Sequence, residues 1–513
     1  MGGFMNKELD SILLRIENAV EKEEYDKALS LIEENVANLF SSRNIKPVIV
    51  LLGNIPEDRF MTPLQKLIRG WVSFMCGDSL DVIKVLTELE PYALTSAEEN
   101  SVYYSLKAVS IFMDNQEEAL SSAKLSVEVM EKDSKSFYMA IARLTYAQLL
   151  SSVGDHRKAA HEFFSAYHIF KKHKSYFPAV TSLVNYGIKK HALGEIADIV
   201  TLFRNELAAS SKYDDDGVFE LLKLPLGIAY FEMNRQNQAI ECLESVKTLM
   251  YQLDFVHMYG VLEMYLVYAY GISGLYSRAY SLINELAGRL SRLSFENIST
   301  FCAALRAHIN LLEGVPVSES DKQLLEADYL AGGKHTPIGT LLILARLKLN
   351  SDMESFSMND LIAWQESPAT VKNVPFTQTA AILTAEYYYQ LREMAYCREY
   401  LEKAVAIYTN YRLSARFLIE KVECLNLLKE INRDLYHLVN SRWDVEAILV
   451  SLTQREHEIL SLMALGLSNK QISNQLCIGI GTIKWHINNI FNKLHVKRRS
   501  QAVAQARKLG LLR

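Results

Sequence analysis

Residues 147–159 read AQLLSSVGDHRKA, and 80 positions later residues 227–239 read GIAYFEMNRQNQA. Each stretch opens on a small residue, has a residue tolerant of left-handed backbone geometry seven positions later, and closes on an alanine. The middle residue belongs to a series spaced by 40, namely Asp114, Gly154, Gly194, Asn234, Gly274 and Gly314. Residues of this kind commonly end helices, so the period predicts a repeated pair of helices.

Small residues recur on both sides of these helix ends. Five positions after the turn residue stand Ala119, Ala159, Ala239 and Ala279, with Ile199 as the exception, and seven positions before it stand Ala147, Gly187, Gly227 and Ala307. Small side chains at fixed positions let two helices approach closely. The spacing resembles the tetratricopeptide helix pair, lengthened from 34 to about 40 residues and without its usual Trp and Pro positions. We therefore expect a solenoid of roughly ten helix pairs from about residue 7 to about residue 435.

The composition agrees with an all-α fold. The chain has 513 residues, of which 49% are hydrophobic and 22% charged, and its 22 Gly and 10 Pro are too few for the turns of an all-β protein. No apolar run reaches the ~18 residues that a membrane-spanning helix needs. The six cysteines occur singly, as in a reducing compartment. These observations predict a cytoplasmic protein without membrane contact, disulfides or a zinc site.

Charge is distributed unevenly along the chain. The last 62 residues hold ten Lys and Arg against two Glu, a net charge of +8, whereas the other 451 residues carry −13. A small basic module joined to an acidic body indicates that one end meets a polyanion. A merely solvated basic surface would have the same charge, so the motifs in this module must decide between the two readings.

The basic module divides into four short helices. It reads LTQREHEILSLMALGLSNKQISNQLCIGIGTIKWHINNIFNKLHVKRRSQAVAQARKLGLL over residues 452–512. Thr453 with Glu456 predicts a capping box for a first helix that stops at Gly466, and Ser468 with Gln471 predicts another for the second helix. The apolar residues expected in the core of these two helices are Ile459, Leu460, Met463, Ile472 and Leu476.

The third helix, which follows a tight turn through Gly479, has two different faces. Its apolar stripe consists of Ile483, Ile487, Ile490 and Leu494. Its opposite face carries Trp485, Asn488, Asn489 and Asn492, with Lys484 and His495 at the margin. A helix that is apolar behind and rich in amides and cations in front suits the DNA major groove, where amides read adenine edges and cations reach guanine or phosphate.

The basic module resembles the C-terminal helix-turn-helix of the LuxR/FixJ family of bacterial transcription regulators. The matching residues are Leu452, Thr453, Arg455, Glu456, Glu458, Leu460, Gly466, Ser468, Asn469, Lys470, Ile472, Leu476, Thr482, Lys484, His486, Lys493, Leu494, Val496, Arg499, Ala502 and Leu509-Gly510-Leu511. Long helical repeats followed by such a module are similar to the MalT-like large regulators of that family, whose ATPase signature we do not find here. We expect an all-α chain, a tetratricopeptide-like α-solenoid followed by a four-helix LuxR-type helix-turn-helix domain.

The resemblance implies roles for individual residues. The third helix becomes the recognition helix, with Lys484, Trp485 and Asn488 at base-reading positions and Thr482 and Arg499 where backbone phosphates are held. The complete expected DNA-binding set is Lys484, Trp485, Asn488, Thr482, Asn492, Lys470 and Arg499. Lys470 has a structural alternative, which is to orient the helix pair. Removing the Arg499 side chain is expected to weaken binding to all sequences alike and to flatten its salt dependence.

Two departures from the family pattern concern the third helix. Gly479 replaces the usual serine before it and caps less well by a few tenths of a kcal/mol. Asn488 stands at a position that is often basic, which leaves the preferred bases open. The fourth helix, from about Ser500, is the part that such regulators often use to dimerise.

The solenoid is expected to bind an effector on its inner face, because curved helical repeats present such a face to peptides, proteins or small molecules. The register against the tetratricopeptide pattern places five side chains there, Gln148, His191, Phe231, Tyr268 and His308. Ordinary packing is the alternative for each of them. The interpreted domains are a repeat sensor over residues 1–437, a linker over 438–451 and the DNA-binding domain over 452–513.

These features predict sequence-specific regulation of transcription, and they favour an activator over a repressor. The expected partners are double-stranded promoter DNA, a small-molecule or protein or peptide effector, RNA polymerase for an activator, and a second copy of the chain on DNA. The alternative is an interaction scaffold or anti-activator whose solenoid sequesters another regulator. An enzyme is not expected, because His161-Glu162 and His457-Glu458 lack the second histidine of a zinc site and residues 328–335 lack the first glycine and the hydroxyl of a phosphate loop. No cofactor or metal is expected.

Overall fold

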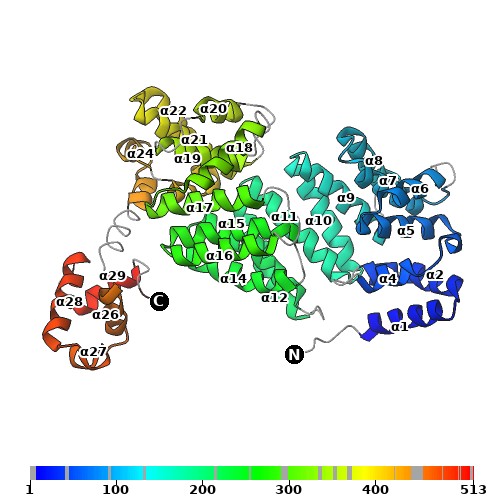
Figure 1. Ribbon diagram of the computed structural model, residues 1–513, viewed down its shortest axis with the longest axis horizontal. Coiled ribbons are helices and arrows are strands. Elements are labelled where there is room, and N and C mark those ends of the chain that lie inside the picture. The colour runs from blue at the N-terminus through cyan, green and yellow to red at the C-terminus, as the bar shows by residue number, and fades with distance from the viewer. Residues whose placement is uncertain are drawn as a thin grey trace. The chain divides into compact units, whose positions relative to one another are not determined.

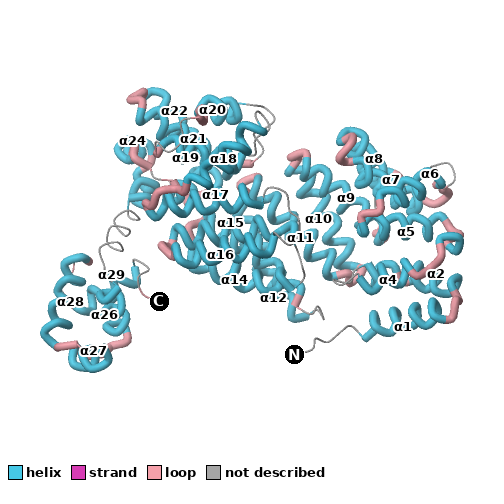
Figure 2. Tube along the Cα trace, in the orientation of Figure 1, coloured by secondary structure: helices cyan, strands magenta, loops and turns pink. Residues whose placement is uncertain are grey.

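The computed structural model describes residues 7–40, 46–89, 94–130, 135–212, 217–252, 256–290, 298–332, 338–350, 355–366, 373–420, 422–440, 454–476, 478–494, 496, 498–508 and 512. Within these ranges the regular structure is helical, and short loops join the helices (Figure 2). None of the described helices is both long and apolar enough to cross a bilayer. Contacts divide the chain into two units, residues 1–384 with 406–419, and residues 385–405 with 420–513.

The first unit is a run of consecutive helices. They are α1 (Lys7–Glu21), α2 (Tyr25–Glu34), α3 (Val36–Phe40), α4 (Lys46–Gly53), α5 (Pro63–Cys76), α6 (Ser79–Glu88), α7 (Ala97–Ile111), α8 (Gln116–Glu128), α9 (Phe137–Ser152), α10 (His156–Lys172), α11 (Tyr176–Ala192), α12 (Ile196–Ala209), α13 (Lys223–Glu232), α14 (Gln236–Gln252), α15 (Val256–Ile272), α16 (Tyr276–Leu290), α17 (Ile298–Glu313), α18 (Glu319–Gly332), α19 (Ile338–Leu349), α20 (Met358–Glu366) and α23 (Ala415–Ile419). Among the described residues, the 3-10 turns η1 (Glu57–Arg59), η3 (Ser210–Lys212) and η4 (Val218–Leu222) interrupt the series.

The second unit contains the end of the repeat region and the basic module. Its helices are α24 (Leu425–Ile431), a helical segment at residues 433–440, α26 (Gln454–Ala464), α27 (Asn469–Leu476), α28 (Ile480–Lys493) and α29 (Arg499–Lys508). Two helices, α21 (Val374–Gln390) and α22 (Met394–Tyr411), run from one unit into the other. The predicted linker at 438–451 begins within the helical segment, and from residue 441 onward it lies outside the described residues.

Helix pairs stack into the predicted solenoid. Neighbours along the chain pack together, as α9, α10 and α11 do side by side in Figure 1. The odd-numbered helices also contact one another, α11 with α13, α13 with α15, α15 with α17 and α17 with α19. These helices therefore form a continuous layer whose surface we call the odd-helix face. The all-α repeat architecture predicted from the 40-residue period is confirmed.

A recurring turn produces the 40-residue period. Gly154, Gly194, Asn234, Gly274 and Gly314 all have positive φ, between +57° and +80°, whereas Asp114 does not. The residue after each of these five donates its backbone N–H to the carbonyl five positions back, as Asp155 does to Leu150 at 2.9 Å and Arg235 does to Tyr230 at 2.8 Å. This bond is the Schellman closure, which satisfies a helix C-terminus and requires the left-handed residue. Asp155 then caps α10 by accepting the N–H of Lys158.

The small residues lie where helices come closest. The recurring Ala119, Ala159, Ala239 and Ala279 are completely buried. A Cβ at Gly187 would lie 2.6 Å from the Cβ of Pro225, and a Cβ at Gly227 would lie 2.8 Å from the Cγ of Leu243. A side chain at either glycine would have to push its neighbours apart, which confirms the predicted close approach.

Glu263 on α15 is a buried carboxyl group in the core of the first unit. Its side chain is fully buried, Tyr251 donates a hydrogen bond to Oε1, and Oε2 has no hydrogen-bond partner among the described residues. Burial raises the pKa of Glu263 to about 7, against the opposing effects of the Tyr251 hydrogen bond and the charge of Lys247. A group whose pKa is raised on folding lowers stability as the pH rises from its unfolded pKa through its folded one.

We expect Glu263→Gln to stabilise the protein above pH 7 and to have little effect near pH 4.5. The amide keeps an acceptor for Tyr251 but cannot ionise, so the variant escapes a penalty of about 3 kcal/mol that corresponds to the shift in pKa. Chemical denaturation of variant and wild type at pH 5 and pH 8 measures the effect. A difference in stability that is the same at both pH values would contradict it.

Candidate functional site

The basic module has a hydrophobic core of its own. The apolar stripe of α28, Ile483, Ile487, Ile490 and Leu494, is buried together with Ile459, Leu460, Met463, Ile472, Ala502 and Ala506 from the other three helices. Leu476 packs against this core while partly exposed. These contacts confirm the four-helix arrangement and the orientation of α28 predicted from its apolar stripe, because one face of the helix is committed to the core.

Polar groups close the turns of this module. Ser468 and Gln471 form the predicted capping box, in which the Ser468 N–H donates to Gln471 Oε1 at 2.8 Å and the Gln471 N–H donates to Ser468 Oγ at 3.4 Å. Gly466 has φ +83° two residues after α26 ends. Thr453 of the first expected capping box lies outside the described residues. Arg455 donates to the carbonyl of Leu476 at 2.8 Å and so ties α26 to the end of α27.

The face of α28 opposite the core is the candidate DNA-binding surface. The side chains of Thr482, Lys484 and Asn488 are exposed there, and Lys470 on α27 is exposed as well. Trp485 and Asn492 lie on α28, but their side chains are outside the described part of the chain. A cation and an amide at positions i and i+4 share one side of a helix, which is the geometry that a recognition helix needs to reach base edges.

Arg499, predicted to contact phosphate, has contacts within the module. Its guanidinium donates to the carbonyls of Leu467 at 2.5 Å and Met463 at 3.2 Å and to Asn469 Oδ1 at 3.2 Å. It therefore joins the start of α29 to the turn between α26 and α27, at the point where α26 leaves carbonyl groups without helical partners. A phosphate contact by this residue stays a prediction.

The contacts of Arg499 predict a loss of stability on truncation. Arg499→Ala leaves the turn carbonyls without these donors, which should cost about 1–3 kcal/mol of the module's unfolding free energy. Arg507→Ala is the matched control, because Arg507 is an exposed arginine on the same helix. Unfolding of a fragment of residues 445–513, followed by the fluorescence of its single tryptophan, compares them. Equal stabilities of the two variants would show that the Arg499 hydrogen bonds do not support the fold.

The five residues expected to bind an effector all lie on odd-numbered helices. His191, Phe231, Tyr268 and His308 come from α11, α13, α15 and α17. The ring centroids are 6.4 Å apart for Phe231 and Tyr268 and 4.6 Å apart for Tyr268 and His308, and Tyr265 lies between His191 and Phe231, at 5.5 Å and 5.3 Å from their rings. His191, Phe231 and His308 are buried and Tyr268 is half-buried, whereas Gln148 on α9 is exposed. The first four thus form a row on the odd-helix face, and their role in binding stays a prediction.

A segment of the chain itself covers part of this row. Residues 412–419, which we call the strap, follow α22, and all residues from 413 to 419 are buried. The short helix within the strap, α23, packs against α13 and α15. Backbone contacts hold it in place, since the Ser414 N–H donates to the Glu232 carbonyl at 2.9 Å and Gln378 Nε2 donates to the Leu413 carbonyl at 3.1 Å.

The strap places a buried arginine against a buried glutamate. Arg416 Nε donates to Glu232 Oε2 at 3.1 Å, and its Nη2 donates to Glu232 Oε1 and, at 3.0 Å, to the Tyr265 hydroxyl. His191 Nε2 lies 2.9 Å from Glu232 Oε1 and 3.1 Å from the Tyr265 hydroxyl. Burial acts to raise the pKa of Glu232, but the charge of Arg416 and the His191 hydrogen bond outweigh it and hold the pKa well below its ordinary value.

The sequence pattern predicted His191 and Phe231 as inner-face residues, but it did not predict the ion pair of Arg416 with Glu232 that lies beside them. Glu232 directly follows Phe231 in the sequence, and a carboxylate next to a predicted inner-face residue was the available signal. Arg416 gives no such signal, because it stands at none of the recurring positions of the repeat and lies 184 residues from Glu232. We call the set of Glu232, Tyr265, His191 and Phe231 the arginine seat.

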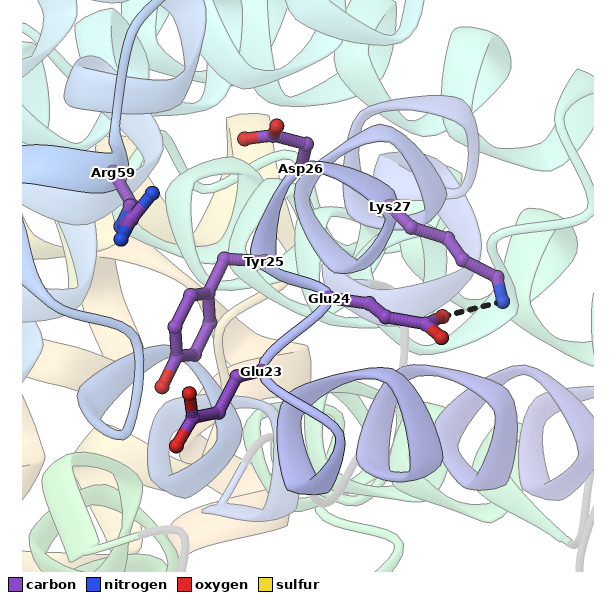
Figure 3. Close-up of a pocket in the computed structure, with 6 residues that line it drawn as sticks. All are labelled: Glu23, Glu24, Tyr25, Asp26, Lys27 and Arg59. Atoms are coloured by element: carbon purple, nitrogen blue, oxygen red, sulfur yellow. Dashed lines mark hydrogen bonds and ion pairs between the residues drawn. The ribbon is translucent and has the colours of Figure 1, made fainter.

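A separate shallow cavity of about 280 Å³ lies near the start of the first unit (Figure 3). It is lined by Glu23, Glu24, Tyr25, Asp26, Lys27 and Arg59. Lys27 pairs with Glu24 at 2.7 Å, and the Arg59 guanidinium lies 5.7 Å from the centre of the Tyr25 ring. These groups are mostly exposed and none belongs to the predicted effector set.

The core packing, the capped turn and the exposed polar face of α28 define the basic module as a helix-turn-helix of the DNA-binding class. Residues 450–506 match the family model described as bacterial regulatory proteins, luxR family. The C-terminal domain is therefore a LuxR-type helix-turn-helix, as the resemblance implied.

Two sequence relatives match the chain over a stretch about as long as this domain. The regulator MalT of Yersinia pestis (strain Pestoides F) is 50% identical over 58 residues, and MalT of Serratia proteamaculans (strain 568) is 48% identical over 58 residues, in each case 11% of this chain and 6% of the relative. The match thus spans a small fraction of the length of these regulators.

Among solved structures, a Rap protein complexed with competence and sporulation factor has a TM-score of 0.41 at 13% identity and covers 79% of this chain and 99% of its own. The APC/C hetero-tetramer Cut9–Hcn1 has a TM-score of 0.35 at 12% identity, and the match covers 85% of this chain and 96% of the chain in that structure. These TM-scores are low, and the repeat architecture described above follows from the helix packing of the chain itself.

Proposed function

We propose that the protein is a sequence-specific transcription regulator, in which α28 reads promoter DNA and the helical repeats bind an effector. The observation that carries the proposal is the two-sided construction of α28, with a buried isoleucine stripe behind Lys484 and Asn488 exposed in front. The net charge of +8 in the last 62 residues supports contact with a polyanion. Activation through RNA polymerase and binding as a homodimer are parts of the same proposal.

Selection from a random pool of duplex DNA by the full-length protein, at near-physiological salt, tests this function. Recovery of an inverted repeat is expected, because two copies of a helix-turn-helix read two half-sites related by symmetry. If residues 445–513 recover a site that the full chain does not, the repeats restrain the DNA-binding domain. Failure of both proteins to enrich any sequence would contradict the proposal.

Lys484→Ala is expected to weaken binding to the selected site by about 1–3 kcal/mol, the usual loss for a side chain that contacts a base. Binding to unrelated DNA should change much less, so the ratio between the two affinities falls. Lys124→Ala serves as the matched control, because it removes an exposed lysine from α8, outside the helix-turn-helix domain. Unchanged affinity of Lys484→Ala for the selected site would show that α28 is docked differently.

A scaffold or anti-activator that sequesters another regulator is the second candidate. The continuous odd-helix face favours it, because stacked repeats offer an extended surface to protein partners. Under this function the basic module would serve in dimerisation, and DNA binding would show no sequence preference. The selection experiment therefore separates the two candidates, and neither of them requires catalysis.

A further inference from the structure

The strap lies on the odd-helix face in the manner of a bound peptide. One of its backbone N–H groups and one of its carbonyls are paired with groups of the repeats, at Ser414 and Leu413. Its arginine makes a two-pronged contact with the Glu232 carboxylate, and the apolar residues beside it, Leu413 and Phe417 among them, are completely buried. The turn at Gly194 is also adapted to this segment, since a Cβ there would lie 2.6 Å from the ring of Tyr411, the residue before the strap.

Stability alone does not account for the buried ion pair. Taking a guanidinium and a carboxylate out of water costs several kcal/mol per ion, and well-packed apolar residues often stabilise a core equally or better. The surrounding core is apolar, so apolar side chains at positions 232 and 416 could fill the same space. A charged pair does, however, make the contact selective for one chemistry, because a planar guanidinium fits a carboxylate at two points and an ammonium does not.

On the basis of the proposed function, we propose that the arginine seat is the binding site for a peptide effector that carries an arginine between apolar residues, and that Arg416 occupies the seat when the effector is absent. Glu232 would recognise the guanidinium at two points, and the Tyr265 hydroxyl would accept a third N–H. The rings of Phe231 and Tyr265, whose centres lie 5.9 Å and 5.8 Å from the guanidinium carbon, form its apolar wall.

The strap and such a peptide exclude each other, because both need the same carboxylate. The chain runs from the strap through α24 to the DNA-binding domain, which begins at α26 only 34 residues after Glu420. Release of the strap would remove the anchor that Arg416 and Ser414 give to the chain on its way to α26, while Glu386 still holds the backbone N–H groups of Glu423 and Cys424. Effector binding and DNA binding become linked in this way, and each must change the affinity for the other by the same factor.

A synthetic peptide of residues 411–420, YRLSARFLIE, is the probe for the seat. Labelled peptide is titrated with full-length Arg416→Ala, whose own strap lacks the competing guanidinium, and with wild type. We expect binding to the variant to be at least about tenfold tighter, because in wild type the tethered strap competes at an effective concentration of the order of millimolar. A peptide with citrulline at the position of Arg416 should bind about 10- to 150-fold more weakly, the usual worth of a hydrogen bond to a charged group.

The double variant Glu232→Gln/Arg416→Ala is the matched control and should lose the preference for the arginine peptide. Equal binding of the arginine and citrulline peptides to folded Arg416→Ala, or no binding at all, would overturn the proposal. Hydrogen exchange on the wild-type chain provides a second test that does not depend on folding of the variant. Millimolar peptide should accelerate exchange of residues 413–419 while α13 and α15 stay protected, and unchanged exchange of the strap would equally overturn the proposal.

DNA selection by the same full-length protein distinguishes this inference from the proposed function. Peptide binding without any enriched DNA sequence would support the arginine seat as a peptide site and contradict the proposed function in transcription regulation. An enriched DNA site together with failure of both peptide tests would support the proposed function and contradict the role of the arginine seat in peptide binding.

Discussion

Replacing Glu232 by alanine should increase opening of the strap a hundredfold or more. The substitution leaves Arg416 buried without its counter-charge, and breaking one side of a buried pair typically costs about 3–5 kcal/mol. Arg416 is 2% exposed and Glu232 is completely buried, so water does not reach either charge in the closed state. Hydrogen exchange of residues 413–419 in the full-length protein measures the opening equilibrium, with the amides of α9 and α10 as an internal reference.

The double variant Glu232→Leu/Arg416→Met is the control for this first prediction. It removes both charges and keeps apolar volume, so most of the lost protection should return. His191 Nε2 and the Tyr265 hydroxyl already lie 3.1 Å apart in the wild-type chain, so each keeps a hydrogen-bond partner in the double variant. If the single and double variants opened to the same extent, the unpaired charge would not be the cause of the loss.

Truncation of Ile490 should unfold the DNA-binding domain and abolish binding to every DNA sequence. The side chain is completely buried in the core of the domain, where removal of three methyl and methylene groups costs about 2–5 kcal/mol. A domain of about 60 residues has a core that supplies only about 3–5 kcal/mol, so the loss is comparable with its whole stability. Circular dichroism of residues 445–513 and DNA binding by the full chain measure the two effects.

Asn488→Ala is the control for Ile490→Ala, since it changes an exposed side chain two positions earlier on the same helix. It should leave the domain folded and alter only the preference among DNA sequences. An Ile490→Ala domain that unfolded at the wild-type denaturant concentration would refute the assignment of this residue to the core.

The solenoid was predictable because its determinants are local. Gly154 and Asn234 adopt left-handed geometry, and the Schellman bond that each permits spans five residues, so a repeat of 40 in the sequence becomes a repeat of turns. Asp114 was expected to behave in the same way and does not, because Asn115 instead closes the turn to the carbonyl of Ile111 at 2.8 Å. Residue identity therefore indicated the period of the turns but not the geometry of each one.

The candidate sites were predictable to different degrees. The buried and exposed faces of α28 follow from a helical period, so Ile483 and Lys484 could be assigned to opposite roles from sequence. Arg499 has the charge of a phosphate ligand, but its hydrogen bonds to Met463 and Leu467 depend on how α29 meets the turn after α26. No spacing of residues in the sequence predicts this contact between α29 and the turn after α26.

Helix ends, apolar helix faces and the position of the basic module can all be predicted from the sequence, because each depends on residues that lie within a few helical turns of one another. The position of the strap against α13 and α15, and the pairing of Arg416 with Glu232, depend instead on how distant segments pack in the folded chain. Those two residues are 184 positions apart, and their contact exists because the chain returns after α22 to pack α23 on α13 and α15. A pair of charges so far apart in the sequence leaves no repeating pattern from which it could be predicted. The two groups need each other only because the packed fold removes both of them from water.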